Sequence, residues 1–110
     1  MKLYNGMSPN GIRVTIFLQE KGIDLPSQQI KIMSGETRGG AYLKINSLGE
    51  IPALELDDGQ ILTESVAICR YLEALNPKPA LMGTGPQEQA MIEMRNRRIE
   101  LNIFNIIGNV

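Results

Sequence analysis

The spacing of apolar residues along the first third of the chain alternates between the period of a strand and that of a helix. A short strand is expected at 2–4, and a helix at 9–21, where apolar side chains recur every three or four residues. Ser8 is a favourable N-cap for this helix, and Gly22 is expected to end it in the left-handed conformation. A second strand is expected at 27–32. A right-handed crossover through the helix would make these two strands parallel.

The next segment predicts a hairpin followed by another helix. Residues 34–40 contain three glycines and are expected to form no regular element, whereas a short helix is expected at 41–45. Two apolar runs within 53–62 flank an Asp-Gly pair, which is a strong hairpin signal. The helical period returns at 64–75. The order β-α-β-α-β-β-α predicts an α/β fold of the thioredoxin-like kind, with a mixed four-stranded sheet and helices on both faces.

The remaining residues predict a linker and one more helical stretch. Prolines and glycines are frequent up to Pro86, and a helical pattern follows from Gln87. This stretch carries apolar residues, among them Ile99 and Ile103, that the first domain alone cannot cover. An isolated helix with so much apolar surface does not stay monomeric in water. We therefore expect that the chain is cut from a longer protein, or else that its tail pairs with another chain.

Composition narrows the chemistry that is open to these 110 residues. The chain has no His and one Cys, which excludes Ser-His-Asp and Cys-His sites, internal disulfides and thiolate-rich zinc sites. No metal is therefore expected. A net charge of −1 argues against nucleic acid or an anionic membrane as a partner. No segment approaches the ~20 apolar residues of a membrane span, and a cytoplasmic location is the default expectation.

Polar residues at the start of the first helix form the first candidate site. The backbone N–H groups and the helix dipole favour an anion there. The Ser8 hydroxyl and the Asn10 amide can each donate a hydrogen bond to such an anion. The simpler alternative is a capping Ser followed by a polar first turn without a function.

Two further motifs precede the third strand and the third helix. A cis bond at Ile51-Pro52 would turn the Ile51 backbone toward an extended peptide, although an ordinary trans proline at a strand boundary is favoured by the sequence alone. Glu64 and Ser65 open the third helix. They could hold the ammonium and the carboxylate of an amino acid, or serve only as a capping segment with an acid in the first turn.

In this order and at these separations, the motifs resemble the N-terminal domain of cytosolic glutathione transferases. The resemblance rests on Ser47–Leu54, Asp58-Gly59 and Leu62–Ile68, and it extends over the whole chain. Ser8-Pro9-Asn10-Gly11 is most similar to the bacterial and fungal subgroup that has Ser/Thr-Pro-Asn-Gly at the active turn.

The resemblance implies a division of the chain and a set of site residues. It implies a thioredoxin-like glutathione-binding domain at 1–76, a linker at 77–86, and the first helix of a truncated all-helical domain at 87–110. Six residues map onto the family's glutathione site: Ser8, Asn10, Ile51, Pro52, Glu64 and Ser65. The first two would be catalytic and lie beside the sulfur. The next two would meet the cysteinyl backbone next to a cis peptide bond, and the last two would bind the γ-glutamyl end.

The function implied by the resemblance is glutathione transfer, with glutathione as co-substrate, by a cytoplasmic homodimer. The Ser8 hydroxyl and the helix N-terminus would favour the thiolate, which attacks a small electrophile or a disulfide. A glutathione-dependent disulfide reductase of the same fold and a non-catalytic interaction module stay open as alternatives. The electrophile pocket would come mostly from absent helices, so the chain alone is expected to bind weakly and not to turn over.

Two residues depart from a simple reading of the site. Many relatives have Lys, Arg or Gln where this chain has Glu50, near the glycine end of the tripeptide, and an acid there would repel the glycine carboxylate. Arg38 or Lys44 could compensate for that charge. Cys69 lies in the middle of the third expected helix, where a cysteine is usually a small buried apolar residue.

Overall fold

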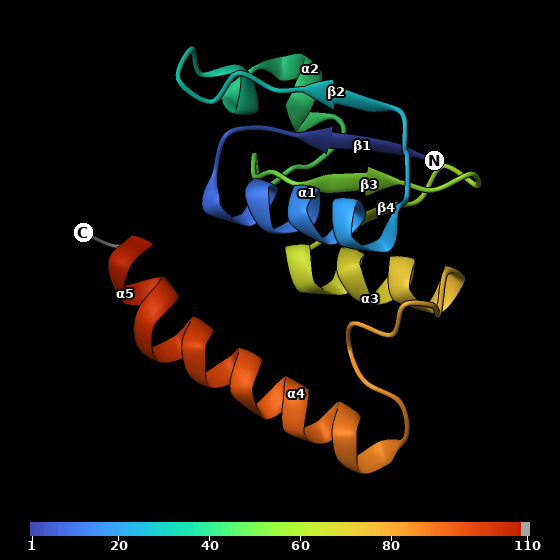
Figure 1. Cartoon of the computed structure of the whole chain (residues 1–110). Coiled ribbons are helices and arrows are strands. Elements are labelled where there is room, and N and C mark those ends of the chain that lie inside the picture. Colours follow the sequence, from blue (N-terminus) through green and yellow to red (C-terminus); the bar gives the residue numbers. More distant parts are fainter. Residues whose placement is uncertain (109–110) are drawn as a thin grey trace. The chain divides into compact units, whose positions relative to one another are not determined.

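The first unit of the chain, Met1–Asn76, is built on a mixed sheet of four strands. The computed structural model describes residues 1–108 (Figure 1). The strands are short and lie in the order β2-β1-β3-β4; they are β1 (Lys2–Asn5), β2 (Ser27–Gln29), β3 (Ala53–Glu55) and β4 (Ile61–Thr63). β1 is parallel to β2 and antiparallel to β3, and β4 is antiparallel to β3. This arrangement confirms the predicted α/β, thioredoxin-like sheet.

Helices cover both faces of this sheet because its two central strands, β1 and β3, carry buried apolar side chains on both sides. Tyr4 and Ala53 belong to one buried cluster with Tyr42, which lies in the short helix α2 (Gly40–Leu43). Side chains alternate along a strand, so the neighbouring residues Leu3 and Leu54 face the opposite side. The helices α1 (Pro9–Lys21) and α3 (Ser65–Leu75) pack against each other, and the buried residues Val14, Ile68 and Leu72 come from these two helices.

Both ends of α1 have the predicted caps. The Ser8 Oγ accepts a hydrogen bond from the Gly11 N–H at 3.0 Å. Gly22 has φ 68, and its N–H and that of Ile23 bond to the last carbonyls of the helix. The Lys21 ammonium, in the last turn, donates to the Glu73 carboxylate of α3 and is fully buried. This ion pair joins the end of α1 to α3.

The sequence prediction was wrong in two places around the second strand. The strand ends at Gln29 instead of continuing to Ile32, because β1 itself ends at Asn5 and offers only one more bond, from the Ile30 N–H to the Asn5 carbonyl at 2.7 Å. Residues 34–40 were expected to be irregular, but they contain the 3₁₀ helix η1 (Glu36–Arg38). Its ends lie next to glycines, which allows so short a helix to begin at φ 79.

The second unit, Pro77–Val110, is helical in its described part after residue 85. α4 (Pro86–Ile99) continues into the π-helical segment η2 (Glu100–Phe104) and then into α5 (Asn105–Gly108). The helical prediction for 87–110 agrees with these elements as far as residue 108, and its last two residues lie outside the described range. Exposed apolar side chains on these helices include Ile99, Ile103 and Ile106. Within residues 1–108, no helix has both the length and the apolar character needed to cross a membrane.

Candidate functional site

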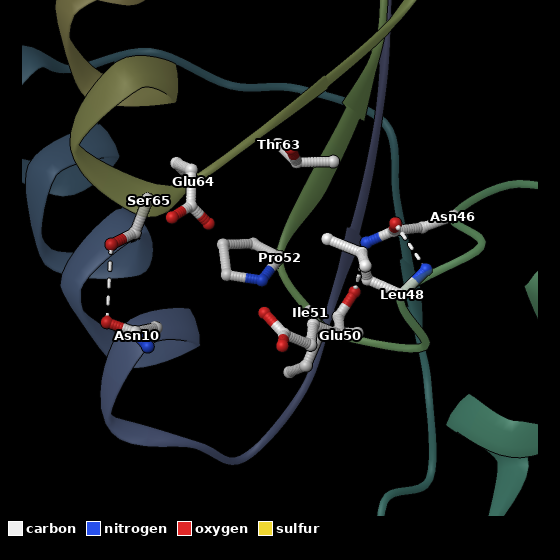
Figure 2. Close-up of a pocket in the computed structure, with 9 residues that line it drawn as sticks. All are labelled: Asn10, Asn46, Leu48, Glu50, Ile51, Pro52, Thr63, Glu64 and Ser65. Carbon is white, nitrogen blue, oxygen red and sulfur yellow. Dashed lines mark hydrogen bonds between the residues drawn. The ribbon is translucent and has the colours of Figure 1, made fainter.

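An open pocket lies at one end of the sheet, where the first turns of α1 and α3 meet the loop before β3 (Figure 2). Nine residues line it: Asn10, Asn46, Leu48, Glu50, Ile51, Pro52, Thr63, Glu64 and Ser65. Five of the six site residues predicted from the sequence are therefore in one place. The sixth, Ser8, does not line this pocket and stands at the N-cap of α1, two residues before Asn10.

Glu64 presents its carboxylate to the pocket from a strained backbone. It has φ 71, which makes it the only residue other than glycine with a positive φ among residues 1–108. Such a conformation costs on the order of 1–3 kcal/mol and tends to occur at functional sites. The capping explanation fails for this side chain, because no side-chain hydrogen bond caps α3. In Figure 2 the carboxylate points into the hollow beside Pro52.

Ser65 connects the starts of α1 and α3 through hydrogen bonds. Its Oγ accepts from the Arg13 guanidinium at 2.9 Å and donates to the Asn10 Oδ1 at 3.3 Å. Ser65 is 6% exposed, so these bonds are largely shielded from water. Arg13 was missed by the sequence analysis. The available signal was its spacing, since residues three apart share a face of a helix and Arg13 follows Asn10 at that interval.

The backbone just before Pro52 is held from two sides. The Glu50 carbonyl accepts from the Tyr42 hydroxyl at 2.6 Å and from the Asn46 side-chain amide at 2.9 Å. Asn46 Oδ1 accepts from the Leu48 N–H at 3.1 Å, which closes the loop on itself. Burial raises the pKa of the Tyr42 phenol, so this hydroxyl remains a proton donor at neutral pH. Tyr42 and Asn46 were also missed by the sequence analysis.

The Ile51–Pro52 peptide bond is cis. The trans bond favoured by the sequence alone is thus wrong, and the conformation implied by the family resemblance is present. Whether this bond is cis or trans depends on the surrounding loop, and the two residues alone do not determine it. No hydrogen bond within residues 1–108 uses the backbone N–H or C=O of Ile51. Both groups are therefore available to a peptide that approaches along the pocket.

The first turn of α1 is held close to the end of β1. The Asn5 side-chain amide donates to the Gly11 carbonyl at 3.0 Å and to the Thr15 hydroxyl at 3.1 Å. Gly11 fits so closely that an added Cβ would lie 2.4 Å from both the Asn5 Oδ1 and the Gly6 carbonyl oxygen. The Ser8 Oγ uses a lone pair to accept from the Gly11 N–H, which leaves its hydroxyl proton free to donate elsewhere.

Other reactive groups lie away from this site. Burial in α3 raises the pKa of the Cys69 thiol to about 11, and the nearby Arg13 charge offsets only part of that effect. The thiol is 2% exposed and protonated at neutral pH, as suits a structural residue. Among residues 1–108, no three or more His, Cys, Asp or Glu side chains are grouped so as to hold a metal ion.

The sheet and its helices define a thioredoxin-like domain, and comparison with known proteins gives its family. Residues 7–75 match the family model described as glutathione S-transferase, N-terminal domain. This match covers more than half of the chain. The chain belongs to the glutathione S-transferase family, as its motifs had led us to expect.

Individual relatives agree with this assignment. The chain is 42% identical over 93 residues to maleylacetoacetate isomerase of Pseudomonas aeruginosa, a match that covers 82% of this chain and 44% of that protein. It is 40% identical over 103 residues to glutathione S-transferase 2 of Saccharomyces cerevisiae, covering 91% and 44%. The chain thus spans less than half the length of these two curated relatives.

Solved structures show the same fold. A glutathione S-transferase domain-containing protein of Marinobacter aquaeolei superposes with a TM-score of 0.91 at 37% identity, over 98% of this chain and 54% of that one. A glutathione transferase homologue from Sulfitobacter, solved with bound glutathione, superposes with a TM-score of 0.81 at 30% identity, over 89% of this chain and 47% of that one.

Proposed function

We propose that this chain forms the glutathione-binding part of a glutathione transferase and that the pocket in Figure 2 binds the tripeptide. The observation that carries the proposal is the meeting of three motifs, far apart in sequence, around one pocket. They contribute Asn10, the Ile51-Pro52 pair and the Glu64-Ser65 pair. Each motif supplies a different part of what a γ-glutamyl peptide needs.

The γ-glutamyl end of glutathione carries an ammonium and a carboxylate on one carbon. The Glu64 carboxylate, which has no hydrogen-bond or ion-pair partner within residues 1–108, is suited to the ammonium. The Ser65 backbone N–H, at the N-terminus of α3, is suited to the carboxylate, since the proton of the Ser65 hydroxyl is already donated to the Asn10 Oδ1. The Arg13 charge, 2.9 Å from the Ser65 oxygen, adds to the attraction for an anion at this point.

The cysteinyl part would then lie along the backbone of Ile51. Its N–H and C=O have no partner within residues 1–108, and a peptide can pair with them as an added strand does. This pairing directs the cysteine side chain toward the start of α1, where Ser8 and Asn10 stand.

The thiol is activated by stabilisation of its thiolate, with no base required. Lowering the pKa of a thiol from ~8.5 by about two units takes ~2.7 kcal/mol. A charge-assisted hydrogen bond from the Ser8 hydroxyl contributes ~1.5–3 kcal/mol, and the N-terminus of α1 adds ~0.3–1 kcal/mol. Together they supply ~1.8–4 kcal/mol, a range that includes the ~2.7 kcal/mol required. The thiolate then forms a bond to an electrophilic carbon, whose leaving group departs with the electron pair.

A second candidate function is glutathione-dependent isomerisation. It is favoured by the 42% identity to the maleylacetoacetate isomerase of P. aeruginosa. The same residues would activate the thiol, but the thiolate would add to its substrate and be expelled again. Family membership also supports a homodimer, a cytoplasmic location and a small electrophile or disulfide as second substrate for the whole protein, and we include these in the proposal.

Calorimetric titration of glutathione into the chain and into Glu64→Gln tests the proposal. Loss of the Glu64 carboxylate is expected to weaken glutathione binding about tenfold. This is the low end of the range for a charge-assisted hydrogen bond, and it is expected because the side chain is exposed to water. Glu20→Gln is the matched control, since Glu20 is an exposed residue of α1 that does not line the pocket. Equal affinities for all three proteins would contradict the assigned role of Glu64.

A further inference from the structure

The charged side chains that line the pocket are both acidic. Of its nine lining residues, only Glu50 and Glu64 carry a charge. In Figure 2 their carboxylates face the hollow from separate sides of Pro52. Arg38 and Lys44, which the sequence offered as compensating charges, are exposed and do not line the pocket. A ligand therefore meets one carboxylate at each of two points and no basic lining residue.

The backbone of Glu50 is held in place, while its side chain is exposed. Its carbonyl accepts from the Tyr42 hydroxyl and from the Asn46 amide, and both of these residues are buried. The carboxylate has no hydrogen-bond or ion-pair partner within residues 1–108. The backbone of Glu50 is therefore held at the edge of the pocket, and the charge of its exposed side chain is available to a ligand.

The direction of a bound peptide determines which of its groups meets Glu50. If the γ-glutamyl ammonium is at Glu64 and the cysteinyl backbone pairs with Ile51, the third residue extends past Ile51. Glu50 immediately precedes Ile51 in the chain, so the C-terminal group of the peptide comes near its carboxylate. A free carboxylate is repelled there, whereas an amide can donate a hydrogen bond and an amine is attracted.

We infer that Glu50 is a specificity-determining residue that favours γ-glutamyl-cysteinyl-glycine derivatives whose C-terminal carboxylate is converted to an amide, with or without an added amine. Glutathione itself, with its free C-terminal carboxylate, is expected to bind more weakly than these amides. The inference rests on the proposed function, because it uses the orientation that Glu64 and Ile51 give to the peptide.

The test compares glutathione with its glycinamide derivative by calorimetry, on the chain as it is and on Glu50→Gln. The chain is expected to bind the amide at least about fivefold more tightly at low salt, and the ratio should shrink as salt screens the charges. In Glu50→Gln the ratio is expected to fall to about one, and in Glu50→Lys to reverse. Glu20→Gln, with the same charge change away from the pocket, should keep the original ratio.

The possible results distinguish a wrong role for Glu50 from a failure of glutathione binding itself. If both ligands bind and the amide has no advantage, or if Glu50→Gln leaves the ratio unchanged, the inference is overturned and the proposed function stands. If neither ligand binds, the proposed function fails and the inference fails with it. Because only the Glu50 backbone carbonyl is used in folding contacts, the side-chain variants are expected to fold, which thermal unfolding checks.

Discussion

Replacement of Gly11 with alanine is expected to lower the free energy of unfolding by about 3 kcal/mol, the upper end for an overpacked site. The added methyl group would lie 2.4 Å from both the Asn5 Oδ1 and the Gly6 carbonyl oxygen. Neither can retreat easily, since one is backbone and the Asn5 side chain is held by its bonds to Gly11 and Thr15. Urea unfolding followed by circular dichroism measures the change.

Gly40→Ala is the matched control for this substitution. An added Cβ at Gly40 meets nothing within 4 Å, and its φ is not positive. The control is expected to unfold within about 0.5 kcal/mol of the original chain. If Gly11→Ala were as mild as Gly40→Ala, the close contact between the end of β1 and the first turn of α1 would be wrong, and with it the placement of Ser8.

The second large effect is expected at Ser8. With glutathione bound, Ser8→Ala should raise the pKa of the glutathione thiol by about 1–2 units, because the lost hydrogen bond favoured the thiolate by ~1.5–3 kcal/mol. The sign follows from the charge: a donor stabilises the anion, so its removal favours the protonated form and less thiolate remains at pH 7. The ultraviolet absorbance of the bound thiolate against pH measures the shift, with S-methylglutathione as the blank.

Two further variants separate chemistry from capping, since Ser8→Ala also removes an N-cap worth ~1 kcal/mol. Ser8→Thr keeps both functions and should preserve the thiol pKa. Ser8→Asp can still accept from the Gly11 N–H, but its carboxylate has no proton to donate. It should keep the fold and raise the thiol pKa. A thiol pKa that is the same in all four proteins would rule out the proposed role of Ser8.

Much of the fold could be predicted because its signals are local. The Ser8 cap, the Gly22 end of α1 and the Asp58-Gly59 hairpin each depend on a few adjacent residues, and each is present. The second strand was predicted too long because its end is set by a pairing with a distant segment and not by a local signal. The alternation at Ile30 and Ile32 looks like a strand, but the length of β2 depends on where its neighbour β1 ends.

The site residues likewise fall into those that local sequence predicts and those that it does not. Its motifs are short strings with a recognisable order, and five of their residues reach one pocket. Arg13, Tyr42 and Asn46 were missed because each acts through a hydrogen bond that no motif announces: to the Ser65 hydroxyl, 52 residues away, for Arg13, and to the Glu50 carbonyl for the other two. The left-handed backbone of Glu64 was also invisible in the sequence, since a glutamate gives no hint of a positive φ.

Amide-resolved NMR tests most directly whether the pocket between the starts of α1, β3 and α3 binds glutathione. Glutathione is titrated into the ¹⁵N-labelled chain and the shifted amide signals are assigned. We expect the largest shifts at Asn10, Ile51 and Ser65, with little change in α4. Saturable shifts confined to α4, or no saturable shifts at millimolar glutathione, would contradict the account.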